Sequence, residues 1–132
     1  MKTRRLWLCV PPILFALCDY AVTMWGQPKE YWAGDYESAI EANPLVLWCM
    51  NVHPALFHGL TFVWIASFCT LILKTPRVLA RVTSLTISYT HASCAGTWLY
   101  REPDDFFVAL ALCIGSSIAY ILGQEMSGDE KT

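Results

Sequence analysis

The sequence predicts an all-α, polytopic membrane protein with four transmembrane helices and one additional short helix. Two features of composition support this class: 55% of the 132 residues are hydrophobic and only 15% are charged, whereas soluble domains carry about 25% charged residues. The apolar residues also gather in runs close to the roughly 20 residues that cross a bilayer. A single membrane domain covers residues 1–132, because little sequence remains once these runs are removed.

The first predicted spanning helix covers residues 6–26. It could be mistaken for a signal peptide, but it lacks the A-x-A cleavage site that such peptides carry. Pro11 and Pro12 remove backbone donors about a third of the way along it. We therefore expect a kink or a loosened turn at these prolines.

Residues 27–43 are rich in acidic and aromatic side chains, which is typical of an outer loop at a membrane interface. The step E-A-N-P closes this loop. Its Asn43-Pro44 pair indicates a helix start, with Glu41 or Asn43 as the cap. The apolar run that follows is too short to span a bilayer, so we predict a short interfacial or re-entrant helix at residues 44–52.

The other three spanning helices are predicted at residues 54–74, 78–100 and 105–124. Small residues recur every four positions in the last two of them. The positions are Ser84, Ser88, Ala92 and Gly96 in the third helix and Ala111, Gly115, Ala119 and Gly123 in the fourth. Because such stripes let helix backbones approach closely in lipid, we expect the last two helices to form a tight hairpin.

The distribution of basic residues predicts the orientation in the membrane. They concentrate in the amino terminus and in the second connection, at Lys2, Arg4, Arg5, Lys74, Arg77 and Arg81, whereas the other two connections are acidic on balance. Since basic connections stay in the cytoplasm, we predict a multi-pass protein of the cell's inner membrane with both termini cytoplasmic. The net charge of −2 argues against a nucleic-acid partner. The predicted partners are the lipid bilayer, and a second copy of the chain or other membrane subunits.

Several polar residues of the predicted bundle form a candidate cluster in the outer half of the membrane. They are Asp19, Thr23, Glu41, Asn43, His58 and His91. An ionisable side chain inside hydrocarbon costs about 2.5–3.5 kcal/mol on insertion scales. Each such residue is therefore expected to be paired, to be hydrated or to have a function.

Three interpretations of this cluster remain open. Asp19, His58 and His91 could hold a divalent metal such as zinc or relay protons, with Glu41 nearby as a base. A haem between His58 and His91 is geometrically conceivable on antiparallel helices, but two lone histidines support it poorly. In the structural interpretation, Asp19 bonds to Thr23 or to a histidine and locks the helices together.

The ordered set Asp19, Thr23 and Gly26, followed by E-A-N-P from Glu41 to Pro44, resembles an uncharacterised family of small prokaryotic membrane proteins. Members of that family, a domain of unknown function, share a D-x-x-x-T helix and an E-x-N-P step. The stretch between Gly26 and Glu41 is longer here than the family's usual turn. The resemblance implies a four-helix membrane fold and brings no agreed activity.

Two functions compete on these observations. The first is a small structural or accessory subunit of a membrane assembly, in which the polar stripe serves helix packing. The second is a metal-binding or proton-handling membrane enzyme or carrier that uses Asp19, His58 and His91. The sequence has no recognised nucleophile motif and no detectable inverted repeat for alternating access, so it favours the first.

Overall fold

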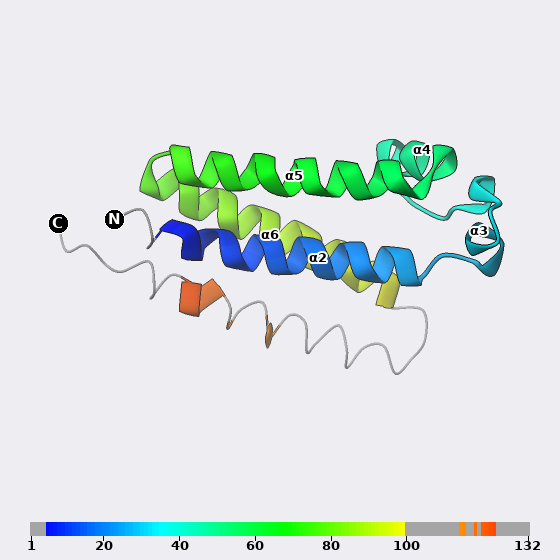
Figure 1. Cartoon of the computed structure of the whole chain (residues 1–132). Coiled ribbons are helices and arrows are strands. Elements are labelled where there is room, and N and C mark those ends of the chain that lie inside the picture. Colours follow the sequence, from blue (N-terminus) through cyan, green and yellow to red (C-terminus); the bar gives the residue numbers. More distant parts are fainter. Residues whose placement is uncertain (1–4, 100–113, 116–117, 119, 124–132) are drawn as a thin grey trace.

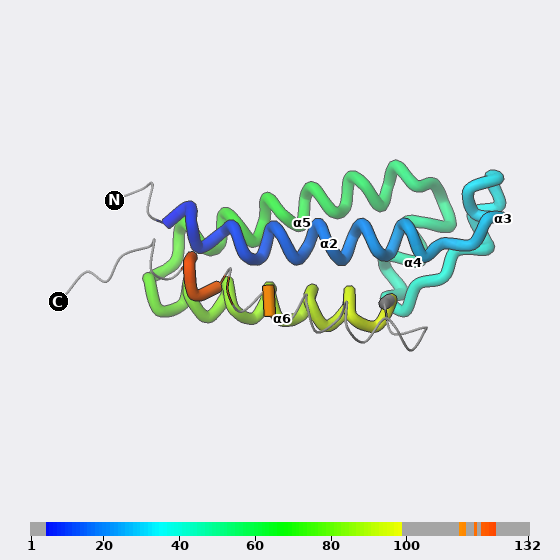
Figure 2. Tube along the Cα trace, turned by 90° about the horizontal axis from the view of Figure 1, so that it is seen from below, coloured from blue at the N-terminus to red at the C-terminus, as the bar shows by residue number. Residues whose placement is uncertain are grey.

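The computed structural model describes residues 5–99, 114–115, 118 and 120–123, and every element among them is helical. The elements are η1 (Trp7–Cys9), α2 (Val10–Trp25), α3 (Lys29–Trp32), η2 (Tyr36–Ser38), α4 (Pro44–Val52), α5 (Pro54–Lys74) and α6 (Arg77–Leu99). The three long helices α2, α5 and α6 run alongside one another, with α3 and α4 at one end (Figure 1, Figure 2). The all-α prediction is confirmed for this part of the chain.

The disturbance expected at Pro11 and Pro12 lies at the junction of η1 and α2. The chain turns as a 3-10 helix over Trp7–Cys9, and α2 begins at Val10, so both prolines fall in the first turn of α2. The N–H groups in the first turn of a helix have no hydrogen-bond partner within that helix. A proline, which lacks the N–H group, therefore costs little stability there. The prolines therefore mark the start of a regular helix that runs to Trp25.

The Asn43-Pro44 pair begins α4 as the sequence predicts. The Asn43 side chain accepts hydrogen bonds from the N–H groups of Leu45 and Val46, at 3.0 and 3.4 Å. Glu41 Oε1 accepts a hydrogen bond from the Asn43 N–H at 2.8 Å. Both predicted residues thus shape this helix start, Asn43 as the cap and Glu41 as the residue that holds the cap.

The second predicted span coincides with α5. His53 separates it from α4, because its extended backbone (φ −174°, ψ 138°) interrupts the helix just before Pro54. His53 Nδ1 accepts a hydrogen bond from the Ala55 N–H at 3.1 Å, so this imidazole caps α5.

Helix α6 packs along α2, and this interface is the most extensive one between two described elements. The buried residues of α6 all have small side chains, namely Ala80, Ser84, Ser88 and Ala95. Ser84 Oγ donates a hydrogen bond to the Leu8 carbonyl oxygen at 2.7 Å. Small residues therefore permit a close approach of α6, as predicted, but the partner is the first helix.

The observed face also differs from the predicted four-residue stripe. Ala92 and Gly96 are only partly buried, whereas Ala95 is fully buried. Four residues turn an α-helix by about 40° more than one full turn, so a strict four-residue repeat leaves the contact face after a few steps. The buried positions of α6 are instead separated by four, four and seven residues.

The predicted hairpin of the last two helices lies mostly outside the described residues. A Cβ placed on Gly123 would lie 3.3 Å from Pro11 Cγ, which belongs to the first helix. Around a Cβ placed on Gly115, no atom of the described residues lies within 4 Å. Gly123 thus lies close to the beginning of the chain.

Two helices of the described part are long and apolar enough to cross a membrane. They are Trp7–Trp25, with 19 residues and a mean hydropathy of 1.6, and Pro54–Lys74, with 21 residues and a mean hydropathy of 1.9. Helix α6, at the third predicted span, has 23 residues but is not in this group. The fourth predicted span, 105–124, lies mostly outside the described residues.

The core consists of two apolar clusters towards opposite ends of the bundle. The first contains Leu8, Cys9, Ala16, Phe68, Ile72 and Ala80. The second contains Met24, Tyr31, Cys49, Met50 and Phe57. On α2 the polar residue Asp19 falls between them in the sequence, which places the candidate site between two packed apolar layers.

Candidate functional site

Asp19, His91 and Trp64 form a hydrogen-bonded chain that joins three helices. His91 Nδ1 on α6 lies 2.8 Å from Asp19 Oδ2 on α2, and Trp64 Nε1 on α5 donates to His91 Nε2 at 3.0 Å. The side chains of Asp19 and His91 are only 17% and 19% exposed. The chain of bonds therefore links α5 to α2 through α6.

The Trp64 contact fixes the tautomer of His91. An indole N–H can only donate, so His91 Nε2 must be the acceptor and carries no hydrogen. The ring hydrogen is then on Nδ1, where it is donated to Asp19 Oδ2. This contact is therefore a charge-assisted hydrogen bond between a carboxylate and a neutral imidazole.

His58 is held by a different residue of α2. The Tyr20 hydroxyl lies 2.8 Å from His58 Nδ1, and the two rings meet edge to face at 5.7 Å. Consecutive residues of a helix point about 100° apart. Asp19 therefore contacts α6 while its neighbour Tyr20 contacts α5, and each predicted histidine bonds to its own side chain of α2.

The predicted metal set of Asp19, His58 and His91 is not assembled. His58 bonds to Tyr20, and no group of three or more His, Cys, Asp or Glu side chains in the described part of the chain is placed to hold a metal ion. Both ring nitrogens of His91 are also engaged by protein groups, and a zinc ion or a haem iron would have to break one of these bonds. The geometry supports the structural interpretation, in which Asp19 bonds to a histidine and locks the helices.

Gln27 continues the polar stripe of α2 and anchors the outer loop. Its Nε2 donates to the carbonyl oxygens of Thr23 and Ile40 at 2.8 and 2.9 Å, and its Oε1 accepts from the Ile40 N–H at 2.9 Å. Thr23 and Gln27 are both buried. Because these hydrogen bonds hold Ile40 next to α2, the following residue, Glu41, lies in the same region as Asp19.

A cavity of about 600 Å³ lies among α2, α4, α5 and α6. Five of the six predicted site residues line it, namely Asp19, Thr23, Glu41, Asn43 and His91. Its remaining walls are mainly apolar and include the aromatic residues Tyr20, Phe57, Trp64 and Trp98. His58 is not among the lining residues, and the sequence did not predict that the other five surround a cavity.

Trp98 forms one wall of the cavity by packing on Gly26. A Cβ placed on Gly26 would lie 2.5 Å from Trp98 Cε3 and 2.7 Å from Trp98 Cζ3. Any side chain at this position would have to displace the indole, since protein interiors are close-packed. This contact gives a physical role to the glycine that follows the D-x-x-x-T residues.

Tyr31 fixes the loop at the same end of the bundle. It is buried in α3, with the rings of Trp32 and Tyr36 at 5.4 and 5.6 Å. In the described part of the chain its hydroxyl has no hydrogen-bond partner. Burial, with the neighbouring Tyr36, raises the pKa of Tyr31 above its ordinary value, so the phenol stays neutral and serves apolar packing.

The sequence did not single out Trp64, Tyr20 or Trp98 as site residues. Aromatic side chains are ordinary members of an apolar run, so their presence alone carries no signal. The usable signal is chemical: a Trp or Tyr inside a span carries an N–H or O–H group that needs a partner. Here His91 accepts from Trp64, and His58 is the partner of Tyr20.

Comparison of the chain with models of protein families, with curated proteins and with solved structures finds no match. The resemblance to a family of small prokaryotic membrane proteins thus stays a prediction. The function has to be inferred from the surface and the cavity of the chain itself.

Proposed function

We propose that the chain is a multi-pass protein of the inner membrane that serves as a structural or accessory subunit of a larger membrane assembly. The observation that carries this proposal is the apolar surface left exposed by the bundle. Phe62 and Val63 on α5 are 71% and 64% exposed, and Val78 on α6 is 77% exposed. Such surface is costly in water but is readily covered by lipid or by neighbouring membrane helices.

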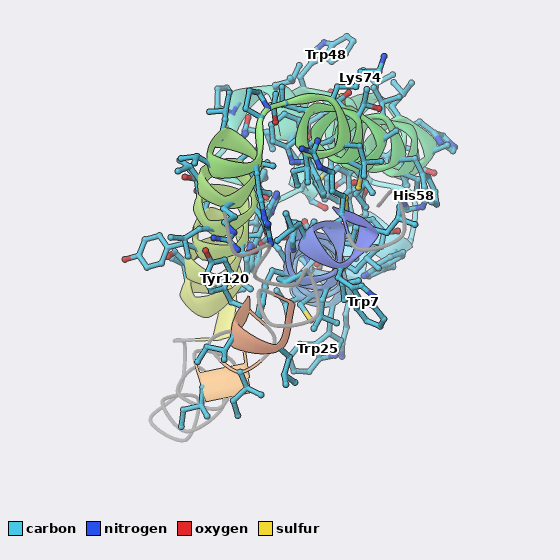
Figure 3. All side chains as sticks on the ribbon, turned by 90° about the vertical axis from the view of Figure 1, so that its left-hand side faces the viewer. Trp7, Trp25, Trp48, His58, Lys74 and Tyr120 are labelled. Carbon is cyan, nitrogen blue, oxygen red and sulfur yellow. The ribbon has the colours of Figure 1, made fainter. Side chains whose placement is uncertain are left out.

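Tryptophans at the α3 and α4 end of the bundle support a membrane interface there. Trp25 is 80% exposed at the end of α2. Trp48 of α4 points away from the bundle, as the view along the helices shows (Figure 3). Indole rings favour the boundary between hydrocarbon and water, so exposed tryptophans near one end fit an aromatic belt.

The charges of the described residues are separated along the bundle. At one end Arg5 Nη1 donates to the carbonyl oxygens of Leu73 and Thr75 at 3.2 and 3.0 Å, which joins the amino-terminal segment to the basic turn between α5 and α6. The other end, around α3 and α4, carries one lysine, Lys29, and four acidic residues, Glu30, Asp35, Glu37 and Glu41 (Figure 1). This separation supports a cytoplasmic amino terminus and an outer loop at 27–43. The predicted fourth span then returns the carboxyl terminus to the cytoplasm.

Cysteine labelling tests the orientation. In a variant without native cysteines, Asp35→Cys is expected to react with a membrane-impermeant maleimide on intact cells, and Lys74→Cys only after permeabilisation. Both positions are exposed, so access to the side chain is not limiting. Labelling of position 35 only from the inside would overturn the orientation, and equal labelling of both positions on intact cells would overturn the membrane-spanning proposal.

Native mass spectrometry after mild detergent extraction tests the role as a subunit. The chain is expected in a discrete species heavier than one copy, because the exposed faces of α5 and α6 are available to other helices. Recovery of a single copy under the mildest extraction conditions would contradict the subunit role. That result would leave the membrane topology standing.

A further inference from the structure

The cavity among α2, α4, α5 and α6 has a chemistry that a purely structural role does not require. We propose that it binds a lipophilic organic cation, a molecule with one positive centre of quaternary ammonium or phosphonium type surrounded by apolar groups. The inference rests on the charge of the cavity, the nature of its walls and its size.

The carboxylates of Asp19 and Glu41 both line the cavity. Their described hydrogen-bond partners carry no positive charge: Asp19 bonds to the neutral imidazole of His91, and Glu41 bonds to the backbone N–H of Asn43. Among the described residues that line the cavity, none is lysine or arginine. The cavity therefore carries negative charge that its own described walls do not balance, and a cation would balance it.

Aromatic side chains supply the second feature. Tyr20, Phe57, Trp64 and Trp98 line the same cavity as the two carboxylates. The face of an aromatic ring attracts a cation, most strongly for tryptophan, and quaternary ammonium groups are typically held in this way. A cation with apolar groups satisfies the carboxylates and the aromatic walls at the same time.

Other occupants fit less well. A small inorganic cation exchanges its water for several protein ligands, and the described residues hold no group of three His, Cys, Asp or Glu side chains placed for this. A neutral lipid tail would exclude water from two carboxylates without supplying a positive charge to balance them. The volume of about 600 Å³ lies within the range of small-molecule sites. Exposed lining residues, such as Asn43, Thr90 and Thr97, give the cavity an opening to the surface.

The test uses the full chain in nanodiscs with tetraphenylphosphonium as the probe, and binding is measured by equilibrium dialysis against protein-free nanodiscs. Tetraphenylborate has nearly the same shape with the opposite charge and is the matched control. The phosphonium ion is expected to bind to the protein. The borate ion is expected to partition no more than it does into protein-free nanodiscs.

The variants Asp19→Asn and Glu41→Gln test the carboxylates one at a time. Each keeps the acceptor oxygen that bonds to His91 or to Asn43, and each is expected to weaken phosphonium binding about tenfold by removing one charge. Glu37→Gln is the control, because Glu37 belongs to the acidic loop but does not line the cavity. Its affinity for the phosphonium ion should equal that of the parent.

Equal binding of the phosphonium and borate ions would overturn the proposal and leave an apolar cavity for lipid. Unchanged phosphonium binding in both carboxylate variants would overturn it as well. A melting curve shows whether each variant is folded, and if Asp19→Asn is not, Glu41→Gln decides alone. The outcome is independent of the subunit proposal, because a single copy that binds the cation would contradict only the subunit role.

Discussion

Replacing Ser84 with leucine is expected to lower the free energy of unfolding by about 3 kcal/mol, because two costs add at one position. Ser84 is fully buried where α6 meets the first helix, and its Oγ donates to the Leu8 carbonyl oxygen at 2.7 Å. The larger side chain has no space between the two backbones. It also leaves the carbonyl oxygen without this donor.

Two further variants separate these costs in thermal unfolding measured in one detergent. Ser84→Ala removes only the hydroxyl and should cost about 1 kcal/mol. Thr86→Leu adds similar bulk to the same helix at an exposed position, and its melting temperature should stay close to that of the parent. If Ser84→Leu were as mild as Thr86→Leu, the close contact between η1 and α6 would be wrong.

The helix boundaries could be predicted because their signals are local. Asn43-Pro44 and His53-Pro54 place the starts of α4 and α5, and both helices have the predicted bounds. A proline restricts its own φ and the residue before it, whatever the rest of the fold does. Such positions can be read from a few neighbouring residues.

The packing partner of a helix face could not be predicted in the same way. The small residues of α6 indicated a close contact, but periodicity describes one helix and does not name the other. Ser84 and Leu8 are 76 positions apart in the sequence. The two matched stripes of small residues favoured a hairpin with the fourth predicted helix, whereas Ser84 bonds to Leu8 in the first.

In the candidate site, too, one part could be predicted from the sequence and another could not. Residue counts along the helices predicted that Asp19, His58 and His91 lie in the outer half of the membrane and could meet, and five of the six predicted residues line one cavity. The rotation of each helix about its axis was not predictable from those counts. It sends His91 to Asp19 and His58 to Tyr20, so the residues meet as two hydrogen-bonded pairs and not as three metal ligands.

Replacing His91 with leucine should lower the free energy of unfolding by about 3 kcal/mol, because two polar groups lose their hydrogen-bond partner. The Asp19 carboxylate loses a hydrogen-bond donor, and the Trp64 N–H loses its acceptor. Asp19→Asn should cost less than about 1 kcal/mol, because the amide oxygen still accepts from His91 Nδ1 while the partly buried charge is removed. Melting temperatures in one detergent compare the two variants.

The double variant His91→Leu with Trp64→Phe isolates the bond between these two side chains. Phenylalanine has no N–H, so the pair should cost about 1 kcal/mol less than the sum of the two single changes. Additive costs would mean that the Trp64 N–H does not depend on His91 Nε2, which would leave the tautomer of His91 unfixed. Stoichiometric zinc in the parent, lost in both Asp19→Asn and His91→Leu, would instead restore the metal interpretation against the hydrogen-bonded chain.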